Sequence, residues 1–440
     1  MKRVFPQLAQ ISLLIVALLT SSFAQSSAPQ KRKKIKDFGS SLKRLKWDPQ
    51  KNAVVQIPST DDVANSEEDI IRIDTSLVSC ELLVVDREGK SVAGLTAADF
   101  TITEDDTPQT VGHFLKGDNI SVPRTIVLIF DYSGSQLPYL KNSVNAAKVL
   151  VDKLGPNDMM AIVTDDVELL QDFTSDKKKL KGKLDRIERR TGKEITSLDY
   201  VINSRLGRSK QYSALMATLN EAFNDADVRP IIIFQTDGDE AYFLKNSPAM
   251  TIPEGMEGDA LQAAKDTLVQ QRKRQLESGT QFSLNDVYRA VEKSRTTVYT
   301  VVPGIRLTGL PLESQVAKVM AKRSEERTID RGKTYEAVSK QDDKDEMFSV
   351  MWQVQRTEKL QSALSGVAGL TGGWTEFLET PEQADQIYSR IFTDINQRYV
   401  VGYYPTNKER DGKRRKIDFE VKGHPEYQIL GRRSYFAPAP

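Results

Sequence analysis

Residues 125–135, with the sequence TIVLIFDYSGS, restrict the fold of this chain more than any other stretch. The near-continuous apolar run at 127–130 is typical of a strand buried on both faces, as in a parallel sheet covered by helices. Asp131, Ser133 and Ser135 follow this run directly. In open α/β sheets, the loops at the carboxyl ends of the strands form the crevice where ligands bind. We therefore predict an α/β fold with this polar loop at the ligand-binding edge.

The first residues predict export of the chain. Residues 1–24 combine a basic start at Lys2 and Arg3, an apolar stretch at 11–19 and small residues before position 25, the pattern of a signal peptide. An uncleaved anchor is the alternative, although the apolar stretch is short for a membrane span. We expect the mature protein in the periplasm or outside the cell.

Composition excludes some classes of protein. The chain has 440 residues, 39% of them hydrophobic, enough for two or three domains. Its formal net charge of +1 becomes −1 once Lys2 and Arg3 are removed with residues 1–24, so no nucleic-acid partner is predicted. The single cysteine, Cys80, permits no disulfide within the chain and is expected as a buried thiol in a strand.

Residues 25–69 are expected to form a flexible basic linker. This segment is poor in apolar residues and rich in serine, lysine and aspartate. Its basic residues could weakly contact anionic surfaces, but a solvated linker is the favoured interpretation.

Two β-rich segments are predicted, an N-terminal one at 70–118 and a C-terminal one at 398–440. Short alternating runs separated by turns indicate antiparallel strands. The expected strands are 76–85, 100–104, 110–114, 399–404, 415–422 and 427–435. Because these segments precede and follow the same α/β unit, we hypothesise that they form one flanking β-domain.

The intervening residues 119–397 alternate strands with helices and predict a doubly wound, mostly parallel sheet. Expected strands are 125–130, 159–163, 168–173 (an antiparallel edge), 231–234 and 297–302, and expected helices are 138–154, 176–190, 213–226, 283–292, 354–368 and one beginning at Thr380. Two long polar stretches, 239–282 and 304–350, exceed ordinary connections and are predicted insertions with some helix of their own or disordered segments.

Two carboxylates distant in the sequence are expected to converge in this sheet. Asp131 and Asp237 follow the first and fourth strands, which are neighbours at the switch point of doubly wound sheets. Ser133 and Ser135 belong to the first loop, and Ser213 begins the helix after the polar loop. Carboxylate and hydroxyl oxygens suit Mg²⁺ or Mn²⁺ rather than zinc. The alternative for Ser213 is a helix N-cap.

With this pattern, the chain resembles the von Willebrand factor A-type domain and, more narrowly, secreted bacterial proteins related to it. The resemblance covers about residues 70–440 apart from the two insertions. Further matching segments are 86–90, 94–96, 99–100, 371–373, 399–403 and 415–417. The resemblance implies a metal-ion-dependent adhesion site in which Asp131, Ser133, Ser135 and Asp237 help bind Mg²⁺. Ser213 stands where the family has threonine. A vacant metal position would then take an Asp or Glu side chain of a protein partner.

Two other classes of function remain as alternatives. A hydrolase would need a base, and the two histidines, His113 and His424, lie in the predicted β-rich segments, away from the carboxylates. Metal-assisted hydrolysis by the same carboxylates is the less favoured version. The other class is a metal-independent scaffold that binds through the insertions at 239–282 and 304–350. We expect a binding module and not an enzyme.

Overall fold

The computed structural model describes residues 34–48, 50, 53–56, 77–116, 123–194, 209–224, 229–246, 251, 252, 255–277, 280–330 and 342–438. The predicted signal peptide lies outside these residues, as does most of the predicted basic linker. Within them, no helix has the length and apolar character needed to cross a membrane.

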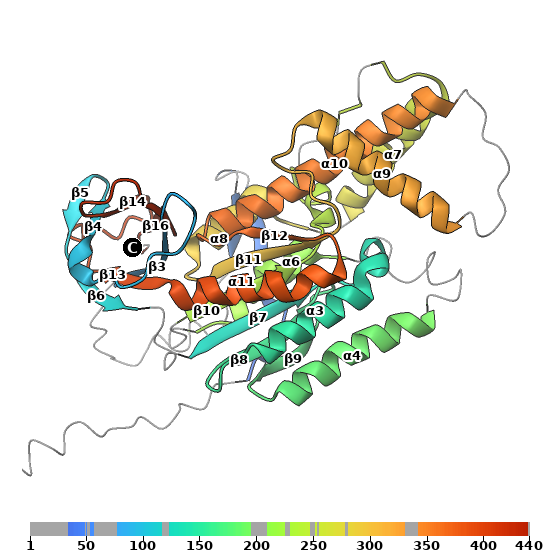
Figure 1. Cartoon of the computed structure of the whole chain (residues 1–440). Coiled ribbons are helices and arrows are strands. Elements are labelled where there is room, and N and C mark those ends of the chain that lie inside the picture. The colour runs from blue at the N-terminus through green and yellow to red at the C-terminus, as the bar shows by residue number, and fades with distance from the viewer. Residues whose placement is uncertain are drawn as a thin grey trace, which may run out of the picture. The chain divides into compact units, whose positions relative to one another are not determined.

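A six-stranded sheet forms the centre of the α/β part (Figure 1). Its order is β12-β11-β10-β7-β8-β9, and only β9 runs antiparallel, pairing with β8 as the predicted edge strand. The strands are β7 (Arg124–Phe130), β8 (Met159–Thr164), β9 (Leu169–Thr174), β10 (Arg229–Gln235), β11 (Thr297–Pro303) and β12 (Thr375–Leu378). The mixed, mostly parallel α/β architecture is as predicted.

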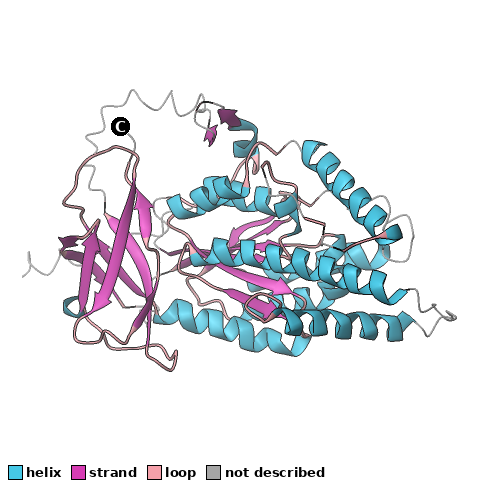
Figure 2. Cartoon of the chain, turned by 90° about the horizontal axis from the view of Figure 1, so that it is seen from above, coloured by secondary structure: helices cyan, strands magenta, loops and turns pink. Residues whose placement is uncertain are grey.

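Helices cover both faces of this sheet, as the view in Figure 2 shows. On one face, α3 (Leu140–Asp152), α4 (Lys177–Glu194) and α11 (Ala384–Gln397) bury one core with alternate residues of the strands. On the other, α6 (Gln211–Glu221), α8 (Leu284–Lys293) and α10 (Asp342–Gly369) pack together, with α6 against β7 and β8 and α10 against β11. Every residue of β7 and β10 is buried, which explains their continuous apolar sequence.

The N- and C-terminal strands pair with each other, as hypothesised. One sheet has the order β15-β3-β13-β6 and the other β16-β14-β4-β5. The members are β3 (Val78–Val85), β4 (Phe100–Glu104), β5 (Thr107–Gln109), β6 (Val111–Leu115), β13 (Tyr399–Tyr403), β14 (Arg414–Val421), β15 (Gln428–Leu430) and β16 (Ser434–Phe436). Side chains of both sheets share one core, which includes the buried thiol of Cys80. We call this pair of sheets the β-sandwich.

Several boundaries differ from the predictions. The strand expected at 427–435 is two short strands, β15 and β16, which belong to different sheets of the β-sandwich. The short strands β5 and β12 were not predicted, because neither contains an apolar run. The helix expected at 354–368 is the second half of α10, which begins at Asp342.

The two predicted insertions contain helices. The first holds the short turn η5 (Asp239–Tyr242) and α7 (Gly258–Glu277), and the second holds α9 (Leu312–Asp330) and the start of α10. Figure 1 shows α7, α9 and α10 grouped together. Contacts of α10 with both α7 and α9 join the two insertions into one helical subdomain.

The prediction of a flexible linker at 25–69 is wrong for part of that segment. A short turn, η1 (Ser40–Arg44), leads into a strand pair, β1 (Leu45–Asp48) and β2 (Ala53–Gln56). The Glu221 carboxylate at the end of α6 accepts hydrogen bonds from the backbone N–H of Gly39 (2.8 Å) and of Ser41 (2.7 Å). This half-buried carboxylate holds η1 on the α/β part despite the polar composition of the segment.

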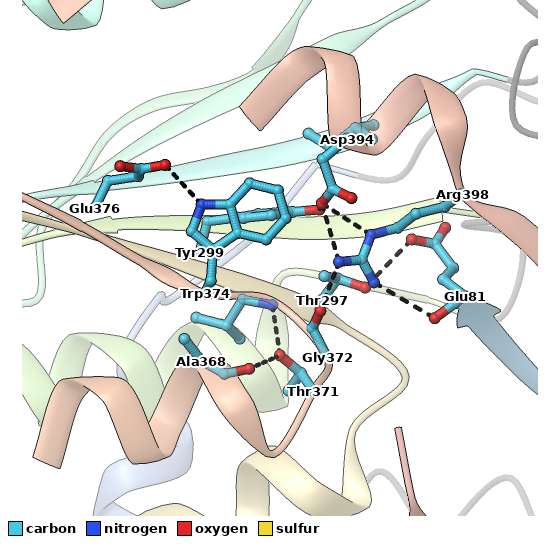
Figure 3. A network of polar contacts seen from close by, with 12 residues as sticks. Glu81, Thr297, Tyr299, Ala368, Thr371, Gly372, Trp374, Glu376, Asp394 and Arg398 are labelled. Atoms are coloured by element: carbon cyan, nitrogen blue, oxygen red, sulfur yellow. Dashed lines mark hydrogen bonds and ion pairs between the residues drawn. The ribbon is translucent and has the colours of Figure 1, made fainter. Parts of the chain in front are cut away.

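A buried arginine joins the α/β part to the β-sandwich (Figure 3). Arg398 lies between α11 and β13 and has no exposed surface. Its guanidinium donates to Asp394 (3.0 Å) and to the carbonyl of Gly372 (2.5 Å), and Asp394 also accepts from the Tyr299 hydroxyl. Glu81 of β3 completes the network through its own carbonyl, which accepts from Arg398 at 3.4 Å.

Replacing Arg398 with methionine should therefore destabilise the protein strongly. The change leaves Asp394 buried without its counter-ion, which costs roughly 3–5 kcal/mol. A matched control is Lys179→Met on α4, because the Lys179 side chain is 66% exposed and that of its partner Asp176 is 42% exposed. That loss should cost about 1 kcal/mol or less. Urea unfolding followed by tryptophan fluorescence measures both, and equal midpoint shifts would contradict the role given to Arg398.

Candidate metal site

The pairing of β7 with β10 brings the two predicted carboxylates to one edge of the sheet. The strands are parallel and in register from Arg124 opposite Arg229 to Phe130 opposite Gln235. The backbone N–H of Asp131 then donates to the carbonyl of Gln235 (3.0 Å), extending the pairing by one residue. Asp131 is 2% exposed, so its carboxylate is held inside the edge rather than in solvent.

The first loop keeps its side chains around Asp131. Asp131 Oδ1 accepts the backbone N–H of Ser133 (2.9 Å), and the hydroxyls of Ser133 and Ser135 lie 3.2 Å apart. Ser133 is buried and Ser135 is exposed, so this pair of hydroxyls leads from the carboxylate to the surface. The chain then turns into η4 (Gly134–Tyr139). The alternation in Asp-x-Ser-x-Ser thus places three oxygen donors on one side of the loop.

The second carboxylate, Asp237, follows β10 after a turn that requires glycine. Gly238 has a φ of 76°, and a Cβ there would lie 3.0 Å from Leu364 Cγ. Asp237 Oδ1 accepts the backbone N–H of Asp239 (3.0 Å), while Oδ2 accepts from Gln136 Nε2 (2.8 Å). The position of Asp237 is therefore fixed both by its own loop and by the loop that carries Asp131.

A glutamine side chain connects the two carboxylates. Gln211 Nε2 donates to Asp131 Oδ2 at 2.7 Å and lies 3.3 Å from Asp237 Oδ1. Its carbonyl oxygen accepts the backbone N–H of Glu240 (2.9 Å). Gln211 is fully buried at the first position of α6. A neutral amide N–H₂ therefore binds both carboxylates at once.

Ser213, predicted as a metal ligand with a helix N-cap as the alternative, is the third residue of α6. Its hydroxyl donates to Glu240 Oε1 (3.1 Å), and no hydrogen bond among the described residues links it to Asp131 or Asp237. Glu240 also accepts the backbone N–H groups of Tyr212 and Ser213, at 2.6 and 3.3 Å. These N–H groups in the first turn of α6 have no partner within the helix, so a carboxylate from outside caps it. Ser213 is part of that cap.

Burial and mutual repulsion disfavour the charges of this cluster. Burial first and the Asp165 carboxylate second raise the pKa of Asp131 to about 7. The pKa of Asp237 is also raised, by burial and then by the charges of Asp131 and Asp239. Burial likewise raises the pKa of Glu240 to about 7. An added positive charge between Asp131 and Asp237 would reverse this penalty.

The donor set fits a divalent cation of the oxygen-preferring kind. Gln136 is 2% exposed, and its carbonyl oxygen has no hydrogen-bond partner within the described residues although its amide nitrogen contacts Asp237. No group of three or more His, Cys, Asp or Glu side chains able to hold a metal occurs in the described ranges. A cation here would need hydroxyl and amide oxygens in addition to two carboxylates, which is a set that Mg²⁺ and Mn²⁺ accept.

Sequence reasoning missed four residues of this site: Gln136, Asp165, Gln211 and Glu240. Gln136 directly follows Ser135, and Asp165 ends β8 as Asp131 ends β7, so a search of all strand ends would have found Asp165. Gln211 stands two residues before Ser213, but its amide is not among the hydroxyl and carboxylate groups on which the prediction was based. No sequence pattern indicates Glu240, because its role depends on the turn η5, which follows β10 and brings this residue against the start of α6.

Comparison of the chain with protein-family models and with curated proteins finds no match. Among solved structures, it is similar to an aerotolerance-related membrane protein from Bacteroides fragilis, with 15% identity, a TM-score of 0.29 and coverage of 62% of this chain and 98% of that one. BatB from Bacteroides thetaiotaomicron is 17% identical, with a TM-score of 0.29 and coverage of 62% of this chain and 98% of that one. A von Willebrand factor type A protein from Catenulispora acidiphila is 11% identical, with a TM-score of 0.30 and coverage of 84% of this chain and 76% of that one. TM-scores this low carry no argument about function.

The raised pKa values predict an unusual dependence of stability on pH in metal-free protein. Between the ordinary aspartate pKa of 3.8 and about 7, the folded protein binds more protons at Asp131 than the unfolded chain does. The contribution of this group to stability is therefore present at low pH and lost as the pH rises toward 7. Melting temperatures recorded across this range in the presence of a chelator should fall with pH.

The variant Asp237→Asn should flatten this fall and raise the melting temperature most near neutral pH. It removes one of two facing charges, and the new amide can donate to the unpartnered carbonyl oxygen of Gln136. The matched control is Asp385→Asn, since the Asp385 side chain is 74% exposed, pairs with Lys153 outside the cluster and should leave the pH dependence unchanged. Two results would contradict the electrostatic account. One is a wild-type melting temperature that rises with pH, and the other is a melting temperature of Asp237→Asn that is lower than that of the wild type near neutral pH.

Proposed function

We propose that the chain is an exported binding module that holds Mg²⁺ or Mn²⁺ through Asp131, Ser133, Ser135 and Asp237 and binds an acidic side chain of a protein partner. The observation that carries this proposal is the Gln211 amide, which donates to both carboxylates at once. Two carboxylates, the buried Asp131 and the half-buried Asp237, accept from one neutral amide and have raised pKa values, so positive charge is favoured between them. The atoms proposed to bind the cation are all oxygens.

The residues of the chain have distinct tasks in this proposal. Asp131 and Asp237 supply the negative charge, and Ser133 and Ser135 supply hydroxyl oxygens on the solvent side. A bound divalent cation provides a Lewis-acidic centre with an exchangeable position for a carboxylate oxygen. The exposed Ser135 marks the side from which a partner would approach. The cap on α6, formed by Glu240, holds Ser213 away from this task unless it rearranges.

Binding rather than catalysis is supported by the positions of the histidines. His113 is on β6 of the β-sandwich, and His424 stacks on Tyr427 beside β15. The carboxylates, in contrast, lie at the carboxyl ends of β7 and β10. We propose no enzymatic role, and we propose the periplasm or the cell exterior as the location because of the signal-peptide pattern at residues 1–24.

Isothermal titration with Mg²⁺ and Mn²⁺ tests the metal site directly. We expect the wild type to bind both ions, and Asp131→Asn to weaken binding by at least about tenfold, because it removes a charged member of the ligand set. The matched control is Asp259→Asn, since Asp259 is exposed in the first turn of α7 and should leave the affinity unchanged. Circular dichroism verifies folding. A wild type that binds neither ion would remove the mechanism.

Gln211→Ala should tighten cation binding about threefold to tenfold. The amide donates to both carboxylates, and these hydrogen bonds must break before a cation takes their place, at about 0.5 kcal/mol net each. Gln262→Ala is the matched control, because Gln262 is exposed on α7 and donates to Asp266 of the same helix. Titration calorimetry again measures the effect. Weaker binding would instead identify Gln211 as a ligand through its carbonyl oxygen.

A further inference from the structure

A recess opens beside the candidate metal site and is lined in part by residues of that site. Its volume is about 470 Å³, and on one side it is lined by Ser135, Tyr139 and Asp237, residues of the two site loops. On the other side it is lined by α9 and α10, the helices of the second insertion, with Lys322, Trp352 and Arg356 among the lining residues. The recess therefore connects the site to a structure that the sheet itself does not require.

The wall formed by α9 and α10 is basic. Lys322, Arg323 and Arg356 line the recess, whereas its carboxylates, Asp237 and Asp239, belong to the site loop. Arg356 forms an ion pair with Asp239, and this carboxylate, against the effect of burial, raises the pKa of Arg356. Among the residues that line the recess, three are therefore cationic and two are carboxylates.

The positive groups are held in place by contacts with their neighbours. Lys322 Nζ lies 4.4 Å from the centre of the Tyr139 ring, a cation–π contact. Arg323 donates to Gln353 (2.8 Å) and to the carbonyl and hydroxyl of Ser349 (3.0 Å each), which joins α9 to α10. Such preorganised groups lose little entropy when an anion binds, which favours recognition of a defined ligand.

We propose that this recess binds an acidic segment of the partner protein, in which one carboxylate is directed to the site at Asp131 and Asp237 and a second to Lys322 and Arg323. This inference rests on the proposed function and adds to it a second subsite and the class of ligand. Charge complementarity favours an acidic peptide, and Trp352 and Tyr139 offer apolar surface to its backbone. The insertion thus selects among carboxylates that a cation alone would not distinguish.

Two synthetic peptides with a fluorescein label test the second subsite. One has the sequence Gly-Asp-Gly-Glu-Gly-Glu-Gly, and in the other both glutamates are replaced by glutamine. Fluorescence anisotropy at saturating Mg²⁺ should show tighter binding of the acidic peptide to the wild type. Lys322→Gln combined with Arg323→Gln should weaken the acidic peptide by about threefold to tenfold and leave the glutamine peptide unchanged.

Further variants separate a local effect from misfolding. Lys322→Gln alone keeps the hydrogen bonds of Arg323 between α9 and α10, and should give part of the loss. Lys265→Gln, an exposed residue of α7 outside the recess, is the matched control and should change neither affinity. The affinity for Mg²⁺ itself should remain within about twofold in all three variants, since none touches the proposed ligands.

The outcomes distinguish this inference from the proposed function. Equal affinities for the two peptides, or an acidic preference that survives the double variant, would overturn the second subsite while leaving metal binding intact. If the wild type binds no metal, the same comparison in a chelator decides the point. A remaining acidic preference that Lys322→Gln reduces would support the recess by itself, and equal binding would overturn it.

Discussion

The parallel pairing of β7 with β10 determines the chemistry of this protein. Because the strands are in register over seven residue pairs, their carboxyl ends reach the same level, and the residues that follow them meet. The buried Asp131 and the half-buried Asp237 thereby lie close together, where burial and neighbouring carboxylates raise the pKa of both. Polar side chains around the two carboxylates donate hydrogen bonds to them. Thr236 and Gln211 donate to Asp131, at 2.8 and 2.7 Å, and Gln136 donates to Asp237. An arrangement that costs stability in the metal-free state is one that a ligand can repay.

The β-sandwich lies at the opposite edge of the sheet from this site. Glu81 of β3 accepts from Arg229 (2.9 Å) and Thr297 (3.2 Å), which are the first residues of β10 and β11. Gly373 approaches the same region so closely that a Cβ would lie 2.0 Å from the carbonyl oxygen of Val298. Figure 3 shows how Arg398 closes this junction. The amino-terminal ends of β10 and β11 thus hold the β-sandwich, whereas the carboxyl-terminal ends of β7 and β10 carry the site loops.

Hydrophobic pattern alone predicted the parts of the fold that are set by burial. The apolar runs located β7 and β10, and the order of elements was enough to place Asp131 and Asp237 on neighbouring strands. The same reasoning failed wherever a distant polar partner decides. The sequence around Ser213 is compatible with a metal ligand or a helix N-cap. Nothing in it indicates the contact that the structure has, a hydrogen bond from the Ser213 hydroxyl to Glu240, which follows β10. The turn η1 was taken for a linker because its partner, Glu221, lies 182 residues from Gly39.

The helical subdomain explains why a site of so few donors could serve a defined partner. A single cation with one exchangeable position binds carboxylates generally, and its contribution to selectivity is small. Selectivity requires further contacts at a fixed distance from the cation, on an element rigid enough to hold them. Helices α9 and α10 meet this requirement, since Arg323 joins one to the other and Arg356 of α10 pairs with Asp239, two residues from Asp237. The ion pair between Arg356 and Asp239 therefore connects the basic wall of the recess to the loop that carries Asp237.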